Sequence, residues 1–351
     1  MFTIEMLPAE RGDCLWITYG VPGDLHQVVI DGGPLETIPT LVPELERRIK
    51  GLPGQANRID LLVVTHIDAD HVQGVVSLLS EASRIKLFRD IWFNGWKHVT
   101  EVLGAPDGER LGSILDGNAR WNKAFGGDAV VVPEAGVLPT KRLAGGMELT
   151  LLSPTPDGLA AIAAAWKRET KEAGLRDQPP KIPKSWQRSE ILGFDAPLLA
   201  ASPYRRDRSA ANFSSIAFIA SYGGKRVLFG ADAHAEVLEA SLQRLGPGPH
   251  KFAAVKVAHH GSKNNLTMSL LGQVRSKKWL ISTNGSKFHH PDAVALARIV
   301  ESQKKPTFYL NYVSDEPQVA AVLGAAGARY SVKAPSRNAD GTYRSGVSLS
   351  L

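Results

Sequence analysis

Hydrophobic and polar positions follow two different patterns along the chain. Residues 59–64 are apolar at nearly every position, which is typical of a short strand buried on both faces. Residues 39–50 instead place apolar side chains three and four positions apart, which is the spacing of one helix face. Because segments of the two kinds alternate, the first third of the chain is predicted to adopt an α/β fold.

The same patterns predict elements over most of the sequence. Strands are expected at residues 2–7, 14–19, 27–30, 59–64, 90–93, 147–152, 214–220, 226–229, 253–258, 279–282 and 346–349. Helices are expected at residues 39–50, 72–79, 235–245, 266–273 and 293–302. The first two strands are predicted to form a hairpin.

The middle of the chain departs from this alternation. Residues 100–208 hold few strand signals besides 147–152, and residues 161–208 are polar, basic and interrupted by prolines. We interpret residues 100–208 as containing a partly irregular insertion or lid within a single domain that spans residues 1–351. The alternative is a solvated loop that binds no ligand.

Composition excludes several classes of protein. Of the 351 residues, 43% are hydrophobic and 22% are charged, which is ordinary for a globular protein and unlike a disordered one. No apolar run reaches the roughly 18 residues that cross a bilayer, and the first residues lack the features of a secretory signal. A cytoplasmic protein without membrane contact is therefore expected. The single cysteine, Cys14, excludes an intrachain disulfide and is predicted to be a buried apolar residue.

Histidines cluster just after predicted strands. Six of the ten histidines form three close pairs, and the remaining four are isolated. The pairs are His66 with His71, His259 with His260, and His289 with His290. Binding sites of α/β folds lie at the carboxyl ends of strands, so these pairs mark a candidate site. Two adjacent histidines point in different directions, which lets one bind a metal ion while its neighbour faces a substrate.

The most informative segment directly follows the apolar run at 59–64. His66, Asp68, Asp70 and His71 place four metal-competent side chains within six residues. Imidazoles and carboxylates suit zinc, manganese or iron, and their density indicates more than one ion. Asp70 could instead cap the next helix, but capping does not account for all four side chains.

A further carboxylate, Asp232, lies just past the predicted strand 226–229. Taken alone, an aspartate in this position is more typical of a turn. Its place after an apolar strand also makes it a candidate metal ligand.

Several motifs occur together in the order found in one known family. They are Gly12-Asp13, Ile30-Asp31-Gly32-Gly33, His66-Ile67-Asp68-Ala69-Asp70-His71, Asn212-Phe213-Ser214-Ser215, Gly230-Ala231-Asp232, His259-His260-Gly261-Ser262 and His290-Pro291. In this combination the chain resembles the metallo-β-lactamase-fold hydrolases, and within them the C-terminal hydrolase domain of bacterial DNA-uptake competence proteins. The motifs cover residues 1–95 and 210–295, while the middle of the chain and the part after residue 300 have no match. The Gly-Ala-Asp segment is one residue longer than the usual Gly-Asp pair.

The resemblance implies a four-layer αββα sandwich, with a site for two Zn²⁺ ions between its sheets; Mn²⁺ or Fe²⁺ are alternatives. The implied ligands are His66 and Asp68 for the first ion, Asp70 and His71 for the second, Asp232 as the bridge, and either His259 or His260 to complete the second ion. The histidine that serves the first ion in much of the superfamily is absent, and Asn212 occupies its region. A site with one ion therefore remains open.

The implied chemistry is hydrolysis by a metal-activated water, with Asp70 in the catalytic centre. For a phosphodiester, His290 is the candidate group for the leaving oxygen, and Asn212, Lys263 and His289 are candidate substrate-binding residues. The net charge of +6 and the basic middle segment favour nucleic acid as the substrate. The alternatives are a small phosphodiester such as a choline ester, then a lactone or thioester, and a metal-binding module without turnover. The sequence does not fix the oligomeric state.

Overall fold

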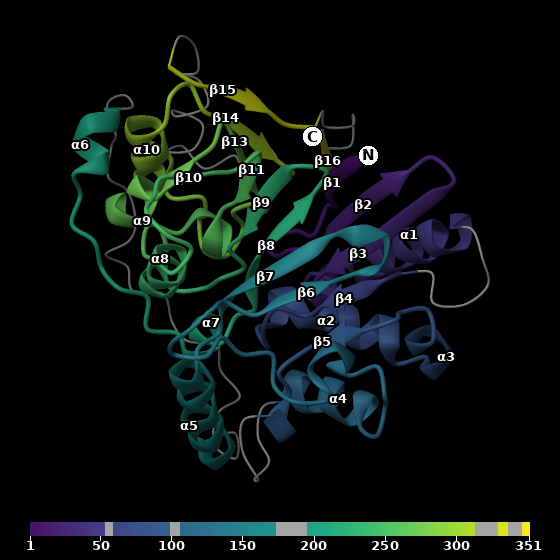
Figure 1. The fold of residues 1–351 in the computed structure, drawn as a ribbon. Helices are drawn as coiled ribbons and strands as arrows, with labels where there is room; N and C mark the ends of the chain where they lie inside the picture. The colour runs from purple at the N-terminus through teal and green to yellow at the C-terminus, as the bar shows by residue number, and fades with distance from the viewer. Residues whose placement is uncertain (53–58, 99–105, 173–194, 313–328, 336–345) are drawn as a thin grey trace.

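Most of the strands that the structure describes form two mixed β-sheets, which pack face to face (Figure 1). The computed structural model describes residues 1–52, 59–98, 106–172, 195–312, 329–335 and 346–351. The first sheet has the order β16-β1-β2-β3-β4-β5, and the second has the order β15-β14-β13-β11-β9-β8-β7-β6.

The first sheet combines an antiparallel half with a parallel half. Its strands are β1 (Phe2–Met6), β2 (Leu15–Val21), β3 (Asp24–Ile30), β4 (Leu61–Val63), β5 (Ile91–Trp92) and β16 (Val347–Ser350). The predicted opening hairpin is confirmed, because β1 and β2 pair antiparallel. β4 is parallel to both β3 and β5, so these three strands end at the same edge of the sheet.

The second sheet is parallel through its centre. Its strands are β6 (Thr140–Arg142), β7 (Glu148–Ser153), β8 (Ala217–Tyr222), β9 (Lys225–Phe229), β11 (Ala254–Lys256), β13 (Lys278–Ile281), β14 (Thr307–Leu310) and β15 (Ser331–Lys333). From β9 to β15 the neighbours are parallel, and from β6 to β9 they are antiparallel. Two further short strands, β10 (His250–Lys251) and β12 (Val274–Arg275), pair separately.

The apolar run around β4 shows why the first sheet is buried on both faces. Leu61 and Val63 belong to a core that also contains side chains of the second sheet. Leu62 and Val64 belong to a separate core, formed with the helices on the other side. Alternate residues of one strand point to opposite faces, so a run without polar interruption supplies both cores.

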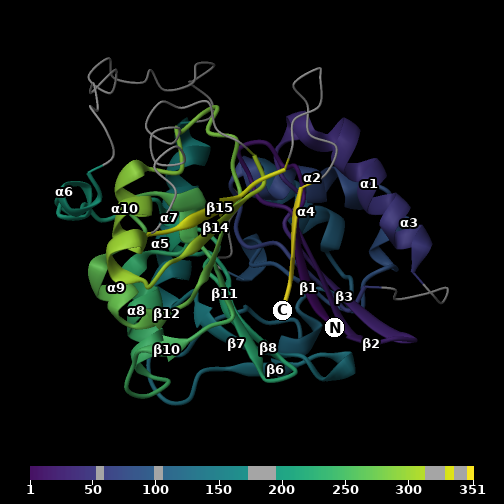
Figure 2. The same ribbon diagram turned by 90° about the horizontal axis from the view of Figure 1, so that it is seen from above.

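Helices cover the outer faces of both sheets (Figure 2). α1 (Ile38–Gly51), α2 (Ala69–Leu79), α3 (Ala82–Ile85) and α4 (Pro106–Leu115) lie beside the first sheet, and α8 (Ala235–Gln243), α9 (Met268–Gly272) and α10 (Ala293–Ser302) lie beside the second. Layers therefore follow the order helix, sheet, sheet, helix. This confirms the α/β class and the αββα sandwich that the resemblance implied.

The stretch interpreted as an insertion contributes partly to the sandwich itself. β6 and β7 join the second sheet, and the buried side chains of Leu149 and Leu151 belong to the core between the sheets. The helices of this stretch are α4, α5 (Pro156–Glu172) and α6 (Ala196–Ala200), followed by α7 (Ala210–Phe213). Residues 173–194, which belong to the predicted lid, lie outside the described residues, so a lid function stays a prediction.

Most expected elements are present, with small shifts at their ends. Cys14 is buried, as predicted. The elements that the sequence patterns did not indicate include β6, β14, β15, α3, α4 and α5. Of the helices that the structure describes, none is long and apolar enough to span a membrane.

Candidate metal centre

The candidate site lies where strands of both sheets end. His66 follows β4 of the first sheet, Asp232 follows β9 of the second, and His259 and His260 follow β11. β9 and β11 are neighbouring parallel strands, so the loops at their carboxyl ends lie side by side. The fold therefore brings together the residues that the sequence singled out from distant parts of the chain.

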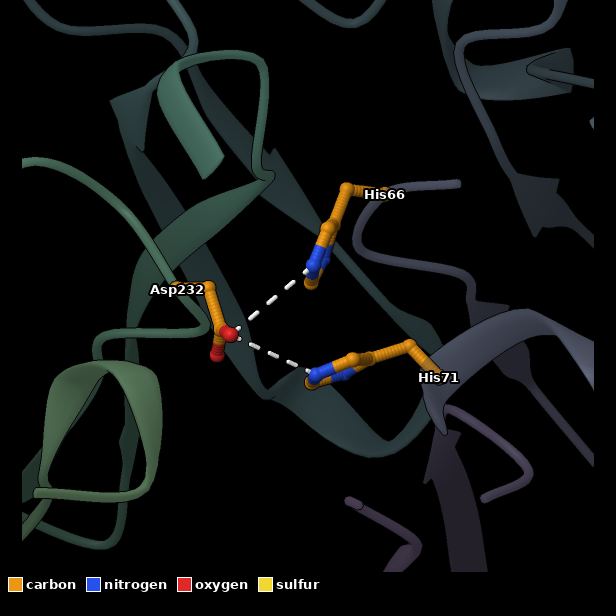
Figure 3. A group of neighbouring side chains, drawn as sticks. All are labelled: His66, His71 and Asp232. Atoms are coloured by element: carbon orange, nitrogen blue, oxygen red, sulfur yellow. Dashed lines mark ion pairs between the residues drawn. The ribbon is translucent and has the colours of Figure 1, made fainter. Parts of the chain in front are cut away.

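One carboxylate oxygen stands at the centre of the cluster (Figure 3). Asp232 Oδ2 lies 3.5 Å from His71 Nε2, 3.6 Å from His260 Nε2, 3.8 Å from His259 Nε2 and 3.9 Å from His66 Nε2. Ligand atoms that each lie about 2.0–2.2 Å from one zinc ion are separated by similar distances. His66, His71 and Asp232 together form a group that could hold a metal ion.

A second group shares His71 with the first. It consists of Asp70, His71 and His260. His260 Nε2 lies 3.6 Å from Asp70 Oδ2 and 3.2 Å from His71 Nε2. Of the two adjacent histidines after β11, His260 is therefore the one beside Asp70 and His71.

Asp68 leaves its carboxylate available although it occupies a capping position. It is the N-cap residue of α2, but its side chain makes no capping hydrogen bond. Instead, Asp68 Oδ2 lies 3.6 Å from His66 Nε2, and 42% of the side chain is exposed. The capping alternative considered for Asp70 does not hold, since Asp70 lies in the first turn of the helix and not at its N-cap.

The donor atoms fit a divalent metal ion. Both His66 Nε2 and Asp232 Oδ1 are buried, and no hydrogen-bond partner reaches either atom from the residues that the structure describes. Buried polar atoms are almost always paired, so such atoms mark a place for an ion or a water molecule. Imidazole nitrogens and carboxylate oxygens are ligands that zinc, manganese and iron accept.

Asp31 and Thr65 contact the Nδ1 atoms of His71 and His66, whereas the Nε2 atoms of both rings face Asp232. Asp31 Oδ2 lies 2.8 Å from His71 Nδ1 and accepts a hydrogen bond from Thr65 Oγ1, also at 2.8 Å. Thr65 Oγ1 is in turn 2.9 Å from His66 Nδ1. The sequence analysis placed Asp31 in a motif but gave it no role. The features that could have indicated a role are the glycines of that motif and the position of Asp31 directly after β3.

His260 is held by the second sheet and by a buried ion pair. Its Nδ1 lies 2.7 Å from the carbonyl oxygen of Ser282 and 3.5 Å from Asp13 Oδ1. Asp13 Oδ2 accepts a hydrogen bond of 2.7 Å from Lys256 Nζ, and both side chains are 1% exposed. Burial favours a higher pKa for Asp13, but the charge of Lys256 together with the neighbouring His260 and His71 outweighs it and lowers the pKa below its usual value.

His259 is surrounded by polar side chains that the sequence analysis did not single out. Its Nδ1 lies 2.8 Å from Asn265 Oδ1 and 3.3 Å from Asp207 Oδ2. Asn212, predicted to bind substrate, is buried and lies behind this ring, with Nδ2 3.2 Å from His259 Nδ1. Its role in substrate binding stays a prediction.

Of the remaining candidates, His290 lies beside the centre in the loop before α10, and Asp292 of this loop contacts Lys263. The His290 ring lies 5.2 Å from the His259 ring, measured between centroids, and its Nδ1 is 3.6 Å from Asp292 Oδ2. Lys263 Nζ is 3.9 Å from Asp292 Oδ1, and the Lys263 backbone amide donates to Asp292 Oδ2. His289 is exposed on the same loop.

The electrostatics of the cluster favour a cation. Burial would raise the pKa of Asp232, but the surrounding imidazoles, His260 foremost, hold this pKa well below its usual range. Burial would lower the pKa of His71, but Asp232 and Asp31 raise it well above its usual value. The centre thus holds an ionised carboxylate beside the His71 imidazole, which attracts a proton, and a metal cation would take the place of that proton.

His290 differs from these imidazoles. Burial, together with the neighbouring charges of His259 and His260, lowers the pKa of His290 well below its usual value. The ring is therefore neutral near pH 7 and carries a single N–H for a hydrogen bond.

Unusual backbone conformations gather at the centre. Asp31, Ala231, His259, His260 and His289 all have positive φ values, between 45° and 59°. Residues other than glycine rarely adopt this region, and such residues concentrate at functional sites. The loops that carry the candidate ligands are therefore held in conformations that their sequence does not favour.

Comparisons with known proteins find solved structures that are similar at low identity. No model of a protein family matches the chain, and no curated protein is similar to it by sequence. Solved structures similar to this chain include the metallo-β-lactamase-fold protein YhfI from Bacillus subtilis, at 9% identity over 100% of both chains with a TM-score of 0.42. Zn²⁺-bound PqqB from Methylobacterium extorquens is similar at 12% identity, over 99% of this chain and 100% of that one, also with a TM-score of 0.42.

A variant of the β-hydroxylase CmlA is similar at 13% identity, over 99% of this chain and 54% of the other, with a TM-score of 0.36. Likenesses this distant say nothing about chemistry, and the fold is assigned from the two sheets and their helices. Resemblance to the DNA-uptake branch stays a prediction from the sequence motifs.

Proposed function

We propose that this chain is a metal-dependent hydrolase that cleaves phosphodiester bonds in nucleic acid. The observation that supports it most is the convergence of three imidazoles and two carboxylates, from both sheets, on one buried point. The competence-type motifs in the sequence favour phosphorus over carbon as the reacting centre. The excess of basic residues favours a polyanionic substrate.

The side chains that could bind a metal ion are more typical of a catalytic metal site than of a structural one. Structural zinc sites are closed cages of four ligands, commonly rich in cysteine. Here the carboxylate of Asp68 is 42% exposed, whereas the side chain of Asp232 is only 3% exposed. A centre that is buried on one side and reaches solvent through a carboxylate leaves room for a substrate.

The residues that would hold one or two ions are His66, Asp68, Asp70, His71, Asp232 and His260. A bound divalent ion at this place supplies Lewis-acid chemistry and lowers the pKa of water toward neutrality. The chain itself orients the ligands: Asp31 fixes His71, Thr65 fixes His66, and the carbonyl of Ser282 fixes His260.

Two further side chains are placed to act on the substrate. Lys263 is 37% exposed and can contact a phosphate oxygen, although Asp292 attracts its ammonium group. His290, which is neutral, can direct its N–H at the leaving oxygen. Both residues lie around Asp292, so they would act on the same side of a bound diester.

A small phosphodiester is the second candidate substrate. His71 and His260 are nearly inaccessible to solvent, at 0% and 1% exposure, so the ligands lie deep. A deep centre favours a substrate that enters whole over a bulky polymer. This observation is the reason to test both classes.

The test compares hydrolysis of bis-p-nitrophenyl phosphate with cleavage of single- and double-stranded DNA and RNA, each with added Zn²⁺ or Mn²⁺. Asp70→Ala is expected to lower every activity at least a hundredfold, since it removes a ligand beside His71 and His260. Asp116→Ala, an exposed aspartate after α4, is the matched control and keeps full activity.

Each result has a distinct meaning. Polymer cleavage that vanishes in Asp70→Ala and weakens steeply with salt supports the nuclease. Turnover of the small diester alone, with little salt dependence, supports the second candidate. Unchanged hydrolysis in Asp70→Ala contradicts the assigned centre.

A further inference from the structure

Asp207 lies at the middle of a polar cluster behind the metal centre. Its Oδ2 accepts hydrogen bonds from Asn212 Nδ2 at 2.7 Å and Asn265 Nδ2 at 2.8 Å, and its Oδ1 accepts one from the Ser209 backbone amide at 2.9 Å. The same Oδ2 is 3.3 Å from His259 Nδ1. Only 9% of the side chain is exposed. Two of these contacts, those with Asn265 and His259, reach the loop after β11, and the other two come from the segment that carries Asp207 itself.

The contacts of His259 define which nitrogen carries its proton. Nδ1 faces two acceptors, Asn265 Oδ1 at 2.8 Å and Asp207 Oδ2 at 3.3 Å. The amide nitrogen of Asn212 is also 3.2 Å away, but it donates to Asp207 Oδ2 at the shorter distance of 2.7 Å. A proton on Nδ1 therefore satisfies the two acceptors and leaves the lone pair on Nε2. Nε2 points toward the centre, 3.8 Å from Asp232 Oδ2.

The backbone of His259 does not fix this orientation unaided. Its φ of 47° lies in the left-handed region, which costs free energy for a residue other than glycine. Contacts outside the loop must therefore stabilise it. Asp207 and Asn265 supply such contacts, and Asn265 is tied to Asp207 by a hydrogen bond.

We propose that Asp207 is a positioning residue that holds the Nδ1–H side of His259 and directs Nε2 at an ion shared with Asp232. His259 is then a metal ligand in addition to His260. This inference rests on the metal-binding part of the proposed function and not on the substrate. It also ties the end of the predicted insertion to the centre, because Asp207 precedes α7.

A carboxylate behind a metal-bound imidazole typically contributes ten- to a hundredfold to metal affinity. Asp207→Asn is therefore expected to raise the dissociation constant for Zn²⁺ by that factor. His259→Ala removes the ligand itself and is expected to raise it at least as much. Because Asp207 acts through His259, the double variant is expected to bind Zn²⁺ no more weakly than His259→Ala alone.

The experiment measures Zn²⁺ binding to the purified full chain by competition with a chromophoric chelator, without any substrate. Co²⁺ absorption spectra of the same variants report the ligand set, and Asp207→Asn and His259→Ala should change the visible bands alike. Asp195→Asn, an exposed N-cap of α6 in the same segment, is the matched control with unchanged affinity. Thermal unfolding of the metal-free proteins shows whether each variant is folded.

Three results would overturn the inference: unchanged affinity in His259→Ala, unchanged affinity in folded Asp207→Asn, or losses that multiply in the double variant. Multiplying losses would mean that Asp207 acts on the fold independently of His259. Should Asp207→Asn fail to fold, His259→Ala and its Co²⁺ spectrum still decide whether the ring is a ligand. If the chain binds Zn²⁺ as expected but cleaves no phosphodiester, the proposed function is wrong while the inference about Asp207 and His259 still holds.

Discussion

The four imidazoles around Asp232 share one arrangement. In His66, His71, His259 and His260 alike, Nδ1 contacts an oxygen of the chain, and Nε2 points toward Asp232. Each ring is thus oriented before any ion arrives, and the contact at Nδ1 favours the tautomer that binds an ion through Nε2. At the scale of single residues, the oxygen atoms that contact each Nδ1 therefore set the geometry of the candidate ligands.

A histidine away from the centre gives a clear pH dependence. His98 Nδ1 accepts a hydrogen bond from the Gly95 amide, and Nε2 lies 3.0 Å from the Gly127 carbonyl oxygen, so the neutral ring is preferred. Burial lowers the pKa of His98 to about 4. The unfolded state therefore binds the proton more readily, and this contribution to stability is complete above pH 6.5 and is lost as the pH falls toward 4.

The expected loss from His98 between pH 7 and pH 4.5 is about 1 to 2 kcal/mol, after allowing for its partial exposure. Urea unfolding at both pH values measures it. His98→Gln should be less stable at pH 7 but show a shallower decline with acid. An identical decline in the variant would assign the acid sensitivity to other groups.

At this scale the sequence predicted the candidate ligands but not the residues that contact them from behind. His66, Asp68, Asp70 and His71 are recognisable because they crowd into one segment. Asp207, by contrast, is a single carboxylate in a polar stretch, and only the tertiary fold brings it to His259. Residues whose role depends on a distant partner leave no local pattern.

At the scale of elements, the centre depends on how closely α2 approaches the loop after β3. The backbone amide of Gly32 donates to the His71 carbonyl oxygen, and that of Gly74 donates to the Gly33 carbonyl oxygen. A Cβ atom on Gly74 would lie 1.7 Å from the Gly32 carbonyl oxygen. Glycine is required there because two backbones are in contact.

Gly74→Ala is expected to push α2 away from this loop and to disturb His71 and its partner Asp31. Overpacking of this kind costs about 1 to 3 kcal/mol in the free energy of unfolding. Gly112→Ala in α4 is the matched control, since its Cβ would meet only an ordinary contact at 3.7 Å and should be neutral or stabilising. Denaturant unfolding and Zn²⁺ affinity are measured for both variants. Equal changes in stability and affinity for Gly74→Ala and Gly112→Ala would contradict the steric argument.

The elements that sequence patterns predicted are those with long or strongly apolar signals. The run at 59–64 and the helical spacing at 39–50 were identified because burial imposes a period on the side chains. β14 is only four residues long, and α5 begins with Pro156 and Asp157 in a region that looked polar and irregular. Short strands supported mainly by their neighbours, such as β14 between β13 and β15, carry too little pattern of their own.

At the scale of the whole molecule, a buried ion pair joins the two sheets. Asp13 belongs to the loop after β1 of the first sheet, and Lys256 belongs to β11 of the second. Their contact lies directly behind His260. The relative position of the sheets and the position of a candidate ligand are thus set by the same pair.

Lys256→Met is expected to lower the free energy of unfolding by about 3 to 5 kcal/mol, because it leaves the Asp13 carboxylate buried without its cation. Adding Asp13→Asn to this variant should recover part of the loss. Lys278→Met, on the neighbouring strand β13, is a partly exposed control with a small effect. Guanidinium unfolding measures all three, and a loss that Asp13→Asn does not reduce would argue against the charge as the cause.

The pairing of β1 with β16 also has a consequence for protein synthesis. Residues 2–6 leave the ribosome roughly 20 to 70 seconds before residues 347–350 are made, at ordinary rates of translation. Throughout that interval one edge of β1 lacks its partner and is open to pairing with other chains. The order of translation therefore leaves β1 of a nascent chain exposed to misassembly until β16 has been made.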